Sequence, residues 1–533
     1  MAGNSQAATY YMANNPSSGN SGWGNGSNSN AGISKALPFL TIAYATDHMS
    51  GGDTLIIDDG TYTGTTNALN SYNGNEPPIG TAGAYTIIKA EHDGEVILDG
   101  NYTNNMFYTV NAGARYWQFE GLIFHTGNDG PVTVRDASYI KFLRCGAYDT
   151  PNGNYGNWVT SGASYILFEG CYAYGSGRYK FLAYHADHII FRNCVGRPDN
   201  IDTTGSLNPA AVFSVYTSNY VKVQNCIAID ADQDVHWITN ARQGCFFVPT
   251  TSGPSTNIAF ESSIGLNVKL GGLQVAQNYD TSNVSFNNIA LWDCPNYAES
   301  AGYGLLLLLR ADQGGAGDYA ANITYGANSA DGGAGDGSWA TNSWPSLTNS
   351  IFYNLQPTSN FWSWGSPIFE DYDLYYANSN HTGAAGTHTS YTTNPIWSTG
   401  NTSGGLKYLP RIESGSNLDG IGQSGADIGA NATTLIGTPG TLWGETGYDT
   451  DTGNSMWPFP SEDLIKEKMA AYTDATHGIT GARGFATGTS KDGSSQTLTK
   501  YIWEYLGNQI PADIYGSSGD TTPPAIPSGL TVR

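Results

Sequence analysis

Apolar and polar residues alternate with a period of two in a short segment that recurs along the middle of the chain. Residues 165–171, for example, have the sequence Tyr-Ile-Leu-Phe-Glu-Gly-Cys. This alternation predicts a short strand with one buried face. Seven such copies begin at Tyr116, Tyr139, Tyr165, His188, Tyr220, Asn257 and Asn283.

Two further short strands accompany each copy. A strand such as Val132 to Arg135 or Phe213 to Tyr216 precedes it, and a third, such as residues 146–148 or 227–229, follows it. Three short strands joined by three turns form one coil of a parallel β-helix, so the chain is predicted to be an all-β solenoid. Successive copies start 23 to 37 residues apart. The surplus near residues 197–210 and 230–256 predicts loops that grow from one region of the solenoid.

Four of the six cysteines occupy the seventh place of the repeat. A disulfide, a metal site or a nucleophile are the functional alternatives, but CxxC spacing is absent and all four share one structural register. They are therefore predicted to form an inward ladder of small side chains. Cys245 and Cys294 lie outside the register and either pair or stay free. The ladder residues are Cys145, Cys171, Cys194 and Cys226.

Two other places of the repeat predict further ladders. Asn193, Asn225 and Asn288 share the sixth place, where stacked amides at a turn would bond one another. The aromatic residues at the first place predict an external aromatic stack rather than a ligand site. The stack would contain Tyr116, Tyr139, Tyr165, His188 and Tyr220.

The segment before the coils predicts a cover for the open end of the solenoid. A short amphipathic helix begins at about Pro38 and stops before Gly51-Gly52. The order of this helix (Pro38–Met49), Gly52-Asp53-Thr54, a strand and Gly60-Thr61-Tyr62 resembles the opening of secreted bacterial proteins of the pectate-lyase-like superfamily. With the coils, the resemblance covers residues 9–430. It implies a right-handed parallel β-helix (solenoid) with an N-terminal capping helix, and a secreted, extracellular protein.

These signals also predict the boundaries of the segments along the chain. Residues 1–34 form an N-terminal segment and residues 35–430 the β-helix with its loop insertions. Residues 431–516 are predicted to be a small helical C-terminal cap with two helices, Ser461 to Tyr472 and Thr497 to Leu506; an independent catalytic domain is the alternative. Residues 517–533 form a Pro-rich linker that resembles the start of a fibronectin type III module.

Composition and charge limit the classes of fold and of binding partner. The 533 residues include 68 Gly, and 22 Lys and Arg stand against 45 Asp and Glu, which gives a net charge of −23. High Gly and low charge argue against a helical bundle, and the negative field argues against a nucleic-acid partner. The most hydrophobic run, Leu305 to Leu309, ends at Arg310 and is too short for a membrane span. The N-terminus lacks the pattern of a signal peptide.

The densest cluster of ionisable residues follows the third strand of its coil. Asp230, Asp232, Asp234 and His236 alternate with other residues and share one side if the segment is extended. Three neighbouring carboxylates repel one another unless a cation neutralises them, and oxygen ligands of this kind suit Ca²⁺. A solvated loop is the alternative. Asp230, Asp232 and Asp234 are thus candidate metal ligands.

The resemblance implies a groove that holds a polysaccharide, and β-elimination on a uronate-containing polymer is the predicted reaction. The phrase Asn267-Val-Lys269-Leu-Gly-Gly272 is similar to the lysine-containing strand of calcium-dependent pectate lyases, which implies that Lys269 is the base. Asp230, Asp232, His236 and Arg242 complete the candidate catalytic set. The candidate substrate-binding residues are Arg135, Tyr184, His185, Tyr216, Arg178, Arg197, Trp237 and Arg310.

Two other functions remain open from the sequence. A β-helix glycoside hydrolase would use a pair of carboxyl groups. A tailspike-like or adhesin-like protein would bind glycan without cleaving it. The candidate carboxyl pairs for hydrolysis come from Asp199, Asp202, Asp230, Asp232 and Asp234.

Overall fold

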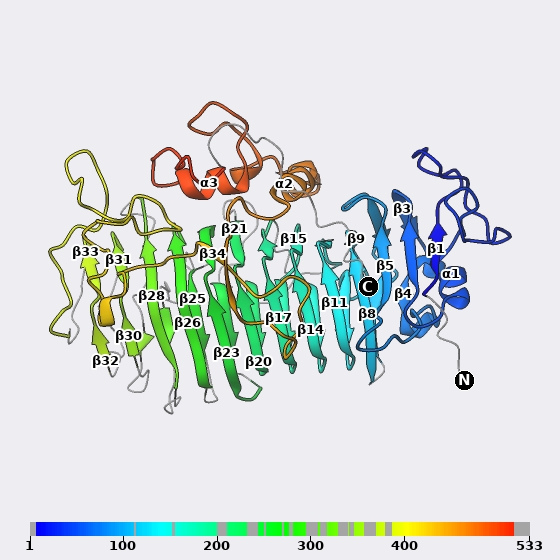
Figure 1. Ribbon diagram of the computed structural model, residues 1–533, viewed down its shortest axis with the longest axis horizontal. Helices are drawn as coiled ribbons and strands as arrows, with labels where there is room; N and C mark the ends of the chain where they lie inside the picture. Colours follow the sequence, from blue (N-terminus) through cyan, green and yellow to red (C-terminus); the bar gives the residue numbers. More distant parts are fainter. Residues whose placement is uncertain are drawn as a thin grey trace.

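The computed structural model of the chain is a long parallel β-helix with a C-terminal segment folded back along its side (Figure 1). Each coil contributes two consecutive strands to one sheet, called sheet A, and one strand to a second sheet, called sheet B. The structure describes residues 7–110, 113–151, 155–199, 210–231, 244–249, 252–268, 271–276, 281–294, 307–309, 317–328, 339–340, 346–355, 369–378 and 386–515.

Sheet A has two rows of strands, because each coil bends between its first and second strand. Row one consists of β1 (Thr9–Met12), β2 (Thr54–Ile57), β5 (Thr86–Ala90), β8 (Ala114–Glu120), β11 (Ser138–Leu143), β14 (Ser164–Glu169), β17 (Asp187–Arg192), β20 (Asn219–Gln224), β23 (Ser255–Glu261), β30 (Ser346–Thr348) and β32 (Phe369–Asp371). Row two consists of β3 (Gly60–Thr63), β6 (Val96–Asp99), β9 (Leu122–His125), β12 (Gly146–Tyr148), β15 (Tyr172–Tyr174), β18 (Val195–Gly196), β21 (Ile227–Ala231), β24 (Ile264–Val268), β31 (Ile351–Tyr353) and β33 (Leu374–Tyr376). The longer β26 (Thr281–Trp292) and β28 (Tyr319–Gly326) run through both rows.

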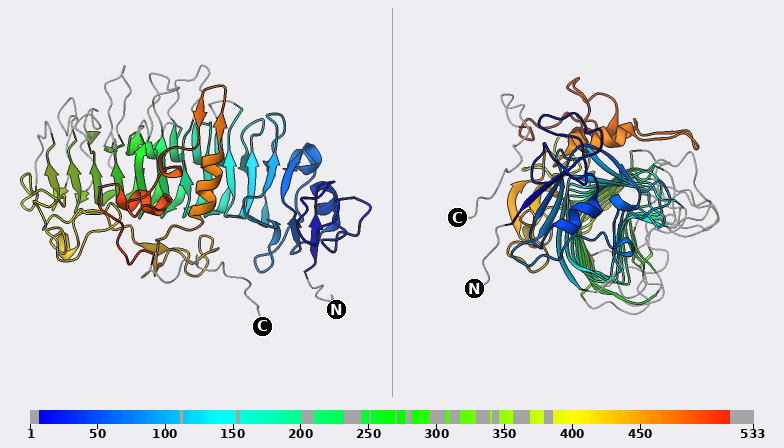
Figure 2. Two further views of the ribbon diagram at one scale, coloured as in Figure 1. Left: turned by 90° about the horizontal axis from the view of Figure 1, so that it is seen from above. Right: turned by 90° about the vertical axis from the view of Figure 1, so that its right-hand side faces the viewer.

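Sheet B closes the third side of the solenoid. Its strands are β4 (Leu69–Asn70), β7 (Phe107–Tyr108), β10 (Val132–Arg135), β13 (Gly156–Ser161), β16 (Tyr179–Tyr184), β19 (Ala211–Tyr216), β22 (Gly244–Pro249), β25 (Leu273–Ala276), β27 (Leu307–Leu309) and β29 (Trp339–Ala340). All strand pairs within these two sheets are parallel, and the axial view shows the coils superimposed (Figure 2). The predicted parallel β-helix is therefore confirmed.

The predicted cysteine ladder lies inside the solenoid. Cys145, Cys171, Cys194 and Cys226 are completely buried. Each thiol donates to a carbonyl oxygen of the preceding coil, as Cys194 Sγ does to Phe168 O at 3.4 Å. The ladder is part of a continuous core in which phenylalanine rings of successive coils also stack.

The external aromatic stack is also present, but the asparagines behave differently from the prediction. The rings of Tyr139 and Tyr165 lie 4.8 Å apart and nearly parallel. Asn193, Asn225 and Asn288 have φ angles of 51°, 53° and 56°, a left-handed conformation that asparagine tolerates better than most residues. The amides of Asn225 and Asn288 bond the C-terminal segment instead of one another, so the predicted amide ladder is wrong for these two residues.

A short helix covers the N-terminal end, as predicted. Helix α1 (Ile42–His48) is capped by the Thr41 hydroxyl, which accepts from the Tyr44 amide. It lies beside β1, and β1 extends sheet A by pairing with β2 (Figure 1). The short 3₁₀ helices η1 (Thr65–Asn67) and η2 (Ser71–Asn73) follow β3 and β4. Phe39 and Ile42 bury their side chains in the solenoid core.

After the last coil the chain crosses the C-terminal end of the solenoid and turns back along its flank. Residues 431–456, called the strap, contain β34 (Thr434–Ile436) and β35 (Asp451–Ser455) and lie across row one. The strap follows η4 (Gln423–Gly425). Arg192 of β17 donates to the Tyr448 carbonyl at 2.6 Å, and Lys141 of β11 pairs with Glu445 at 3.1 Å. These contacts hold the strap to the outer surface of row one.

Residues 457–515, called the cap, cover row two. They contain α2 (Glu462–Ala471), β36 (Thr473–Asp474), β37 (Ile479–Thr480), η5 (Gly484–Ala486) and α3 (Leu498–Glu504). Both predicted helices exist, and they lie on the flank of the middle coils (Figures 1 and 2). Their apolar residues share a core with outward side chains of row two, such as Ile229 and Leu266. The linker predicted at 517–533 lies outside the described residues, and none of the described helices has the length and apolar character of a membrane span.

Candidate functional site

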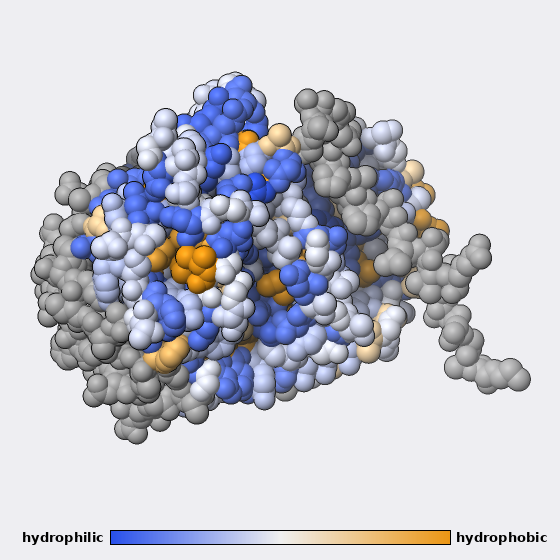
Figure 3. All heavy atoms as spheres, turned by 60° about the vertical axis from the view of Figure 1, so that its left-hand side comes forward, coloured by the Kyte–Doolittle hydropathy of each residue, from blue (hydrophilic) through white to orange (hydrophobic). Residues whose placement is uncertain are grey.

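Sheet B is the side of the solenoid that the described C-terminal residues, 386–515, do not cover (Figure 2). The strap bonds row one and the cap bonds row two. Among the described residues, none of the recorded hydrogen bonds joins residues 386–515 to a strand of sheet B. The flank that carries the strap and the cap is mostly hydrophilic, with small separate apolar patches (Figure 3). An extended ligand therefore has its most regular surface on sheet B.

One row of outward side chains on sheet B contains three of the predicted substrate-binding residues. Arg135, Ser161, Tyr184 and Tyr216 are register partners on β10, β13, β16 and β19. The rings of Tyr184 and Tyr216 lie 5.2 Å apart, and the ring of His185 meets that of Tyr184 edge to face at 4.2 Å. Parallel strands are about 4.8 Å apart, so this row repeats at a spacing set by the backbone.

A second outward row makes the centre of the face apolar. Val159, Leu182, Ser214 and Phe247 follow one another on successive strands. Tyr184 and Tyr216 pack against the cluster that contains Leu182, Phe247 and Tyr179. Leu182, Ser214 and Phe247 are only 9%, 0% and 1% exposed, so this row supports the face from beneath. Tyr184 and Tyr216 are partly exposed, and their rings suit the flat faces of sugar rings.

Two arginines add positive charge to this face. The side chain of Arg135 is 52% exposed, and a hydrogen bond with Tyr108 raises its pKa. The guanidinium of Arg178 lies 4.7 Å from the centre of the Tyr179 ring, and burial lowers its pKa. Arg135 is in register with Tyr184 at the end of β16, whereas Arg178 precedes the start of β16, so the two guanidinium groups lie at opposite edges of the sheet. Arg135 also pairs with Asp136 at 3.5 Å.

Asp230 lies in a different environment from the one predicted. Its side chain is 0% exposed, because the cap covers it. Oδ1 accepts from Asn267 Nδ2 at 2.8 Å and from the Tyr501 hydroxyl at 2.9 Å, and Oδ2 accepts from the Phe485 amide at 2.8 Å. Burial raises the pKa of Asp230, while these donors oppose the rise. The carboxylate holds the cap and is not exposed in a groove as a metal ligand or catalytic group.

Arg197 is also removed from the predicted substrate-binding set by its burial. Its guanidinium pairs with Asp199 at 2.9 Å and donates to the carbonyl oxygens of Gly481 and Met469 in the cap. Asp199 in addition pairs with Arg483 at 2.8 Å. Burial alone would raise the pKa of Asp199, but the two guanidinium groups lower it. This buried network fixes the cap to row two.

Acidic and amide side chains align at the end of row two, and the sequence did not reveal their partners in the cap. Asp230, Asn267 and Asp293 follow strand positions that are in register on successive coils. The tyrosine hydroxyls of the cap bind these acids: Tyr472 binds Asp149, Tyr501 binds Asp230 and Tyr505 binds Asp293, each at 2.9 Å. The only signal in the sequence was the spacing of Tyr501 and Tyr505, which places both on one helix face.

The other predicted site residues lie outside the described residues. They include the candidate base, Lys269, and the candidate metal ligands Asp232 and Asp234. The last described residues before these segments, Ala231 and Val268, are register partners on β21 and β24. In the described part of the chain, no group of three His, Cys, Asp or Glu side chains is arranged to hold a metal ion. The remaining predicted residues outside it are His236, Arg242, Trp237 and Arg310.

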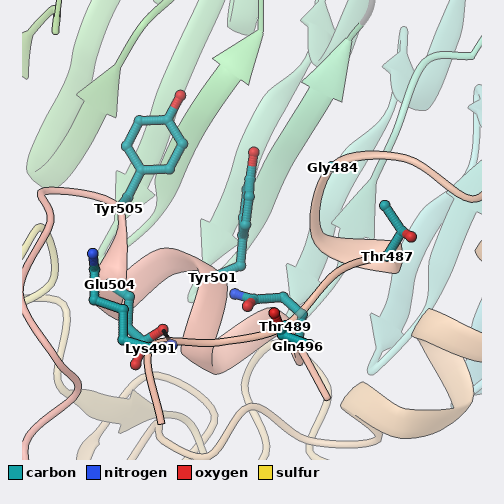
Figure 4. Close-up of a pocket in the computed structure, with 8 residues that line it drawn as sticks. All are labelled: Gly484, Thr487, Thr489, Lys491, Gln496, Tyr501, Glu504 and Tyr505. Carbon is teal, nitrogen blue, oxygen red and sulfur yellow. Dashed lines mark hydrogen bonds between the residues drawn. The ribbon is translucent and has the colours of Figure 1, made fainter. Parts of the chain in front are cut away.

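The cap contains a pocket that sequence reasoning did not predict. It has a volume of about 310 Å³ and lies between α3 and the loop that precedes it (Figure 4). Tyr501 and Tyr505 form one wall. The pocket is lined by Gly484, Thr487, Thr489, Lys491, Gln496, Tyr501, Glu504 and Tyr505.

Comparisons with known proteins find likeness in fold only. No protein-family model matches the chain, and no curated protein matches its sequence. Among solved structures, the pectate lyase Pel9A is 15% identical with a TM-score of 0.44, covering 80% of this chain and 96% of its own. The alginate lyase AlyGC is 14% identical with a TM-score of 0.42, covering 73% and 57%. An alginate lyase from Paenibacillus sp. is 14% identical with a TM-score of 0.33, covering 58% and 94%.

Proposed function

We propose that this protein binds a linear, uronate-containing polysaccharide along sheet B and cleaves it by β-elimination. The observation that carries the binding part is the register of Arg135, Ser161, Tyr184 and Tyr216 on sheet B, the side that the described C-terminal residues do not cover. A polymer with repeating rings fits a surface whose stacking and charged groups repeat with the strands. The proposal also places the protein outside the cell, where such polymers occur.

The proposed chemistry requires three groups. Elimination removes the proton at C5 of the uronate and expels the sugar bonded through O4, which leaves a C4–C5 double bond. A cation must neutralise the carboxylate, a base must accept the C5 proton, and a donor must protonate the leaving oxygen. Lys269 is proposed as the base, on its resemblance to the lysine-containing strand of pectate lyases. Arg135 and Arg178 are proposed to bind substrate carboxylates.

The binding part can be tested with a matched pair of tyrosine variants. Tyr184→Ala should lower turnover roughly tenfold or more, because stacking on the sugar ring and the contact with Tyr216 are both lost. Tyr165→Ala removes a half-buried tyrosine from row one and should leave turnover unchanged. The assay follows ultraviolet absorbance of the unsaturated product and reducing ends in parallel, on a panel of acidic and neutral polysaccharides. Equal losses in the two variants would contradict a binding role for sheet B.

The chemical part has its own test. Lys269→Ala should abolish turnover and leave the melting temperature within a few degrees of the wild type. Retained turnover would exclude Lys269 as the base. New reducing ends without ultraviolet absorbance would identify hydrolysis instead. Two of the carboxyl groups predicted as candidates for hydrolysis, those of Asp199 and Asp230, are buried beneath the cap and cannot reach a substrate.

Calcium remains a prediction for Asp232 and Asp234 alone. The Asp230 carboxylate already accepts hydrogen bonds from three protein donors, so it is not proposed as a ligand. If the remaining carboxylates hold Ca²⁺, EDTA should abolish elimination and added Ca²⁺ should restore it. Full activity in EDTA would contradict a calcium requirement.

A further inference from the structure

We propose that the pocket in the cap is a second carbohydrate-binding site, which accepts one sugar ring of a glycan. This site lies on the flank of the solenoid and is separate from sheet B. The inference does not depend on cleavage at sheet B. It is carried by the rigidity of the pocket walls and by polar side chains that have no partner among the described residues.

The aromatic wall of the pocket is held by the solenoid. The Tyr501 hydroxyl donates to Asp230 and the Tyr505 hydroxyl donates to Asp293, each at 2.9 Å. The two rings lie 5.5 Å apart with an angle of 76° between their planes. Because both hydroxyl groups are occupied, the rings can offer only their apolar surfaces to a ligand. A wall that is fixed before binding reduces the entropy lost on binding.

The opposite wall is fixed to α3 through Glu504. This carboxylate is mostly buried, and its Oε2 accepts from the Lys491 amide at 2.8 Å. Its Oε1 accepts weakly from the Ile510 amide at 3.4 Å. The loop at Lys491 is therefore held to the helix, while the ammonium group of Lys491 stays available to a ligand.

Gln496 supplies the observation that points to a ligand. The residue is 6% exposed, and its side-chain amide makes no hydrogen bond with the described residues. The amide points from the loop towards Tyr501, into the space between the loop and α3 (Figure 4). The amide atoms are not sealed off from solvent but open into the pocket, so they can bond a ligand or water there. The hydroxyl groups of Thr487 and Thr489 are likewise uncommitted among the described contacts.

The chemistry of these groups selects a sugar ring. The pocket offers an amide that donates and accepts, two hydroxyl groups, one ammonium group and two aromatic surfaces. Hydroxyl groups of a pyranose ring match the amide and the threonines, and the apolar face of the ring matches the tyrosines. The volume of about 310 Å³ is at the small end of ligand sites, which suits one sugar unit rather than a chain. Lys491 would favour a ring that carries a carboxylate.

The test measures binding of short oligosaccharides by titration calorimetry. The probes are oligogalacturonate, which is acidic, and oligoxylose, which is neutral. The protein for this test carries Tyr184→Ala, so that binding at sheet B is weakened and the cap dominates the signal. We expect that adding Gln496→Ala weakens binding of the preferred oligomer at least tenfold. Lys491→Met should weaken only the acidic oligomer.

A matched control separates the pocket from general effects on the cap. Gln509→Ala makes the same change at an exposed position of the cap outside the pocket, and it should leave binding and melting temperature unchanged. Equal affinity in the Gln496 and Gln509 variants would overturn the proposal, as would the absence of binding by both oligomers. Failure of the proposed cleavage would show as missing unsaturated product in the wild type, which is a separate measurement.

Discussion

The edge of row two and the outer face of sheet B are built by the same stacking of coils. The cap bonds the first, whereas the described C-terminal residues do not bond the second. On row two, the carboxylates of Asp149, Asp230 and Asp293 each accept a hydrogen bond from a tyrosine hydroxyl of the cap. On sheet B, Tyr184 and Tyr216 align equally well, and none of the described C-terminal residues bonds them. The difference shows that regular alignment of side chains identifies a surface but does not reveal whether the protein itself occupies it.

The largest expected effect comes from removing the acid that anchors the cap. Asp230→Ala deprives Asn267, Tyr501 and the Phe485 amide of their acceptor in a fully buried place. We expect a loss of about 3 kcal/mol or more in the free energy of unfolding, measured by urea denaturation. Amide exchange should become faster in residues 457–515 and stay slow in the strands of sheet B.

Gly484→Ala offers an independent way to detach the cap. An added Cβ would lie 1.8 Å from Asp230 Oδ2, and the φ of 53° also disfavours alanine. If both variants left exchange in the cap as slow as in the wild type, Asp230 would not be an anchor of the cap.

The second effect compares two buried carboxyl groups, Asp199 and Glu370, whose pKa values are shifted in opposite directions. Asp199 pairs with two arginines, whereas Glu370 of β32 lies in the last coil with Tyr375 and Asp371 nearby, and burial raises its pKa to about 7. Folded Glu370 therefore keeps its proton over a range where the unfolded chain releases it. Its contribution to stability is present below pH 4.5 and is lost as the pH rises from about 4.5 to about 7.

Glu370→Gln should remove this pH dependence. At pH 8 the variant should melt at a higher temperature than the wild type, and at pH 4 the two should melt alike, as measured by circular dichroism. Asp199 has the opposite sign: its pKa is lowered, so its contribution is present at neutral pH and is lost in acid. A wild type less stable than the variant at pH 4 would contradict the assignment to Glu370.

A smaller effect is expected in the core that both faces share. Cys194→Ser replaces a buried thiol of the ladder with a hydroxyl group, which is more costly to remove from water. The loss should be about 1 to 2 kcal/mol, and turnover should not change. An unchanged melting temperature would argue against the ladder as a packed, apolar column.

The smallest effect on stability is expected on sheet B. Arg135→Ala truncates an exposed side chain and should change the free energy of unfolding by less than about 0.5 kcal/mol, while it weakens binding of acidic polysaccharide. Arg197→Ala is the matched change beneath the cap and should destabilise the protein strongly without a direct effect on binding. Similar melting curves for the two variants would remove the distinction between the two faces.

Much of the solenoid could be predicted because its coils repeat in sequence. The period-two alternation located β11, β14 and β17, and the seventh place located the buried cysteines. The strands that precede the repeated segment were also located, as β10 and β19. These features depend on neighbouring coils, which lie about 25 residues apart in the chain.

The site could be predicted only in part, because its surroundings depend on contacts across hundreds of residues. Asp230 looked like a free carboxylate in a row of acids, but residues 485 and 501 supply its donors. Arg197 looked like a substrate-binding cation, but its partners are the carbonyl oxygens of residues 469 and 481. The amides of Asn225 and Asn288 were misjudged for the same reason. No periodic signal in the cap indicates where on the solenoid it lies.

The reversal of the chain at residue 430 changes how the whole molecule should unfold. A bare solenoid has contacts only between adjacent coils, so it can fray one coil at a time. Here Lys468 pairs with Glu95 at 2.7 Å, and Arg192 bonds the strap 256 residues further along the chain. Fraying of a middle coil must therefore break contacts with the strap and cap as well. The C-terminal segment thus turns a quasi-one-dimensional array into a cooperative unit, and this coupling can be complete only after synthesis has passed the last coil.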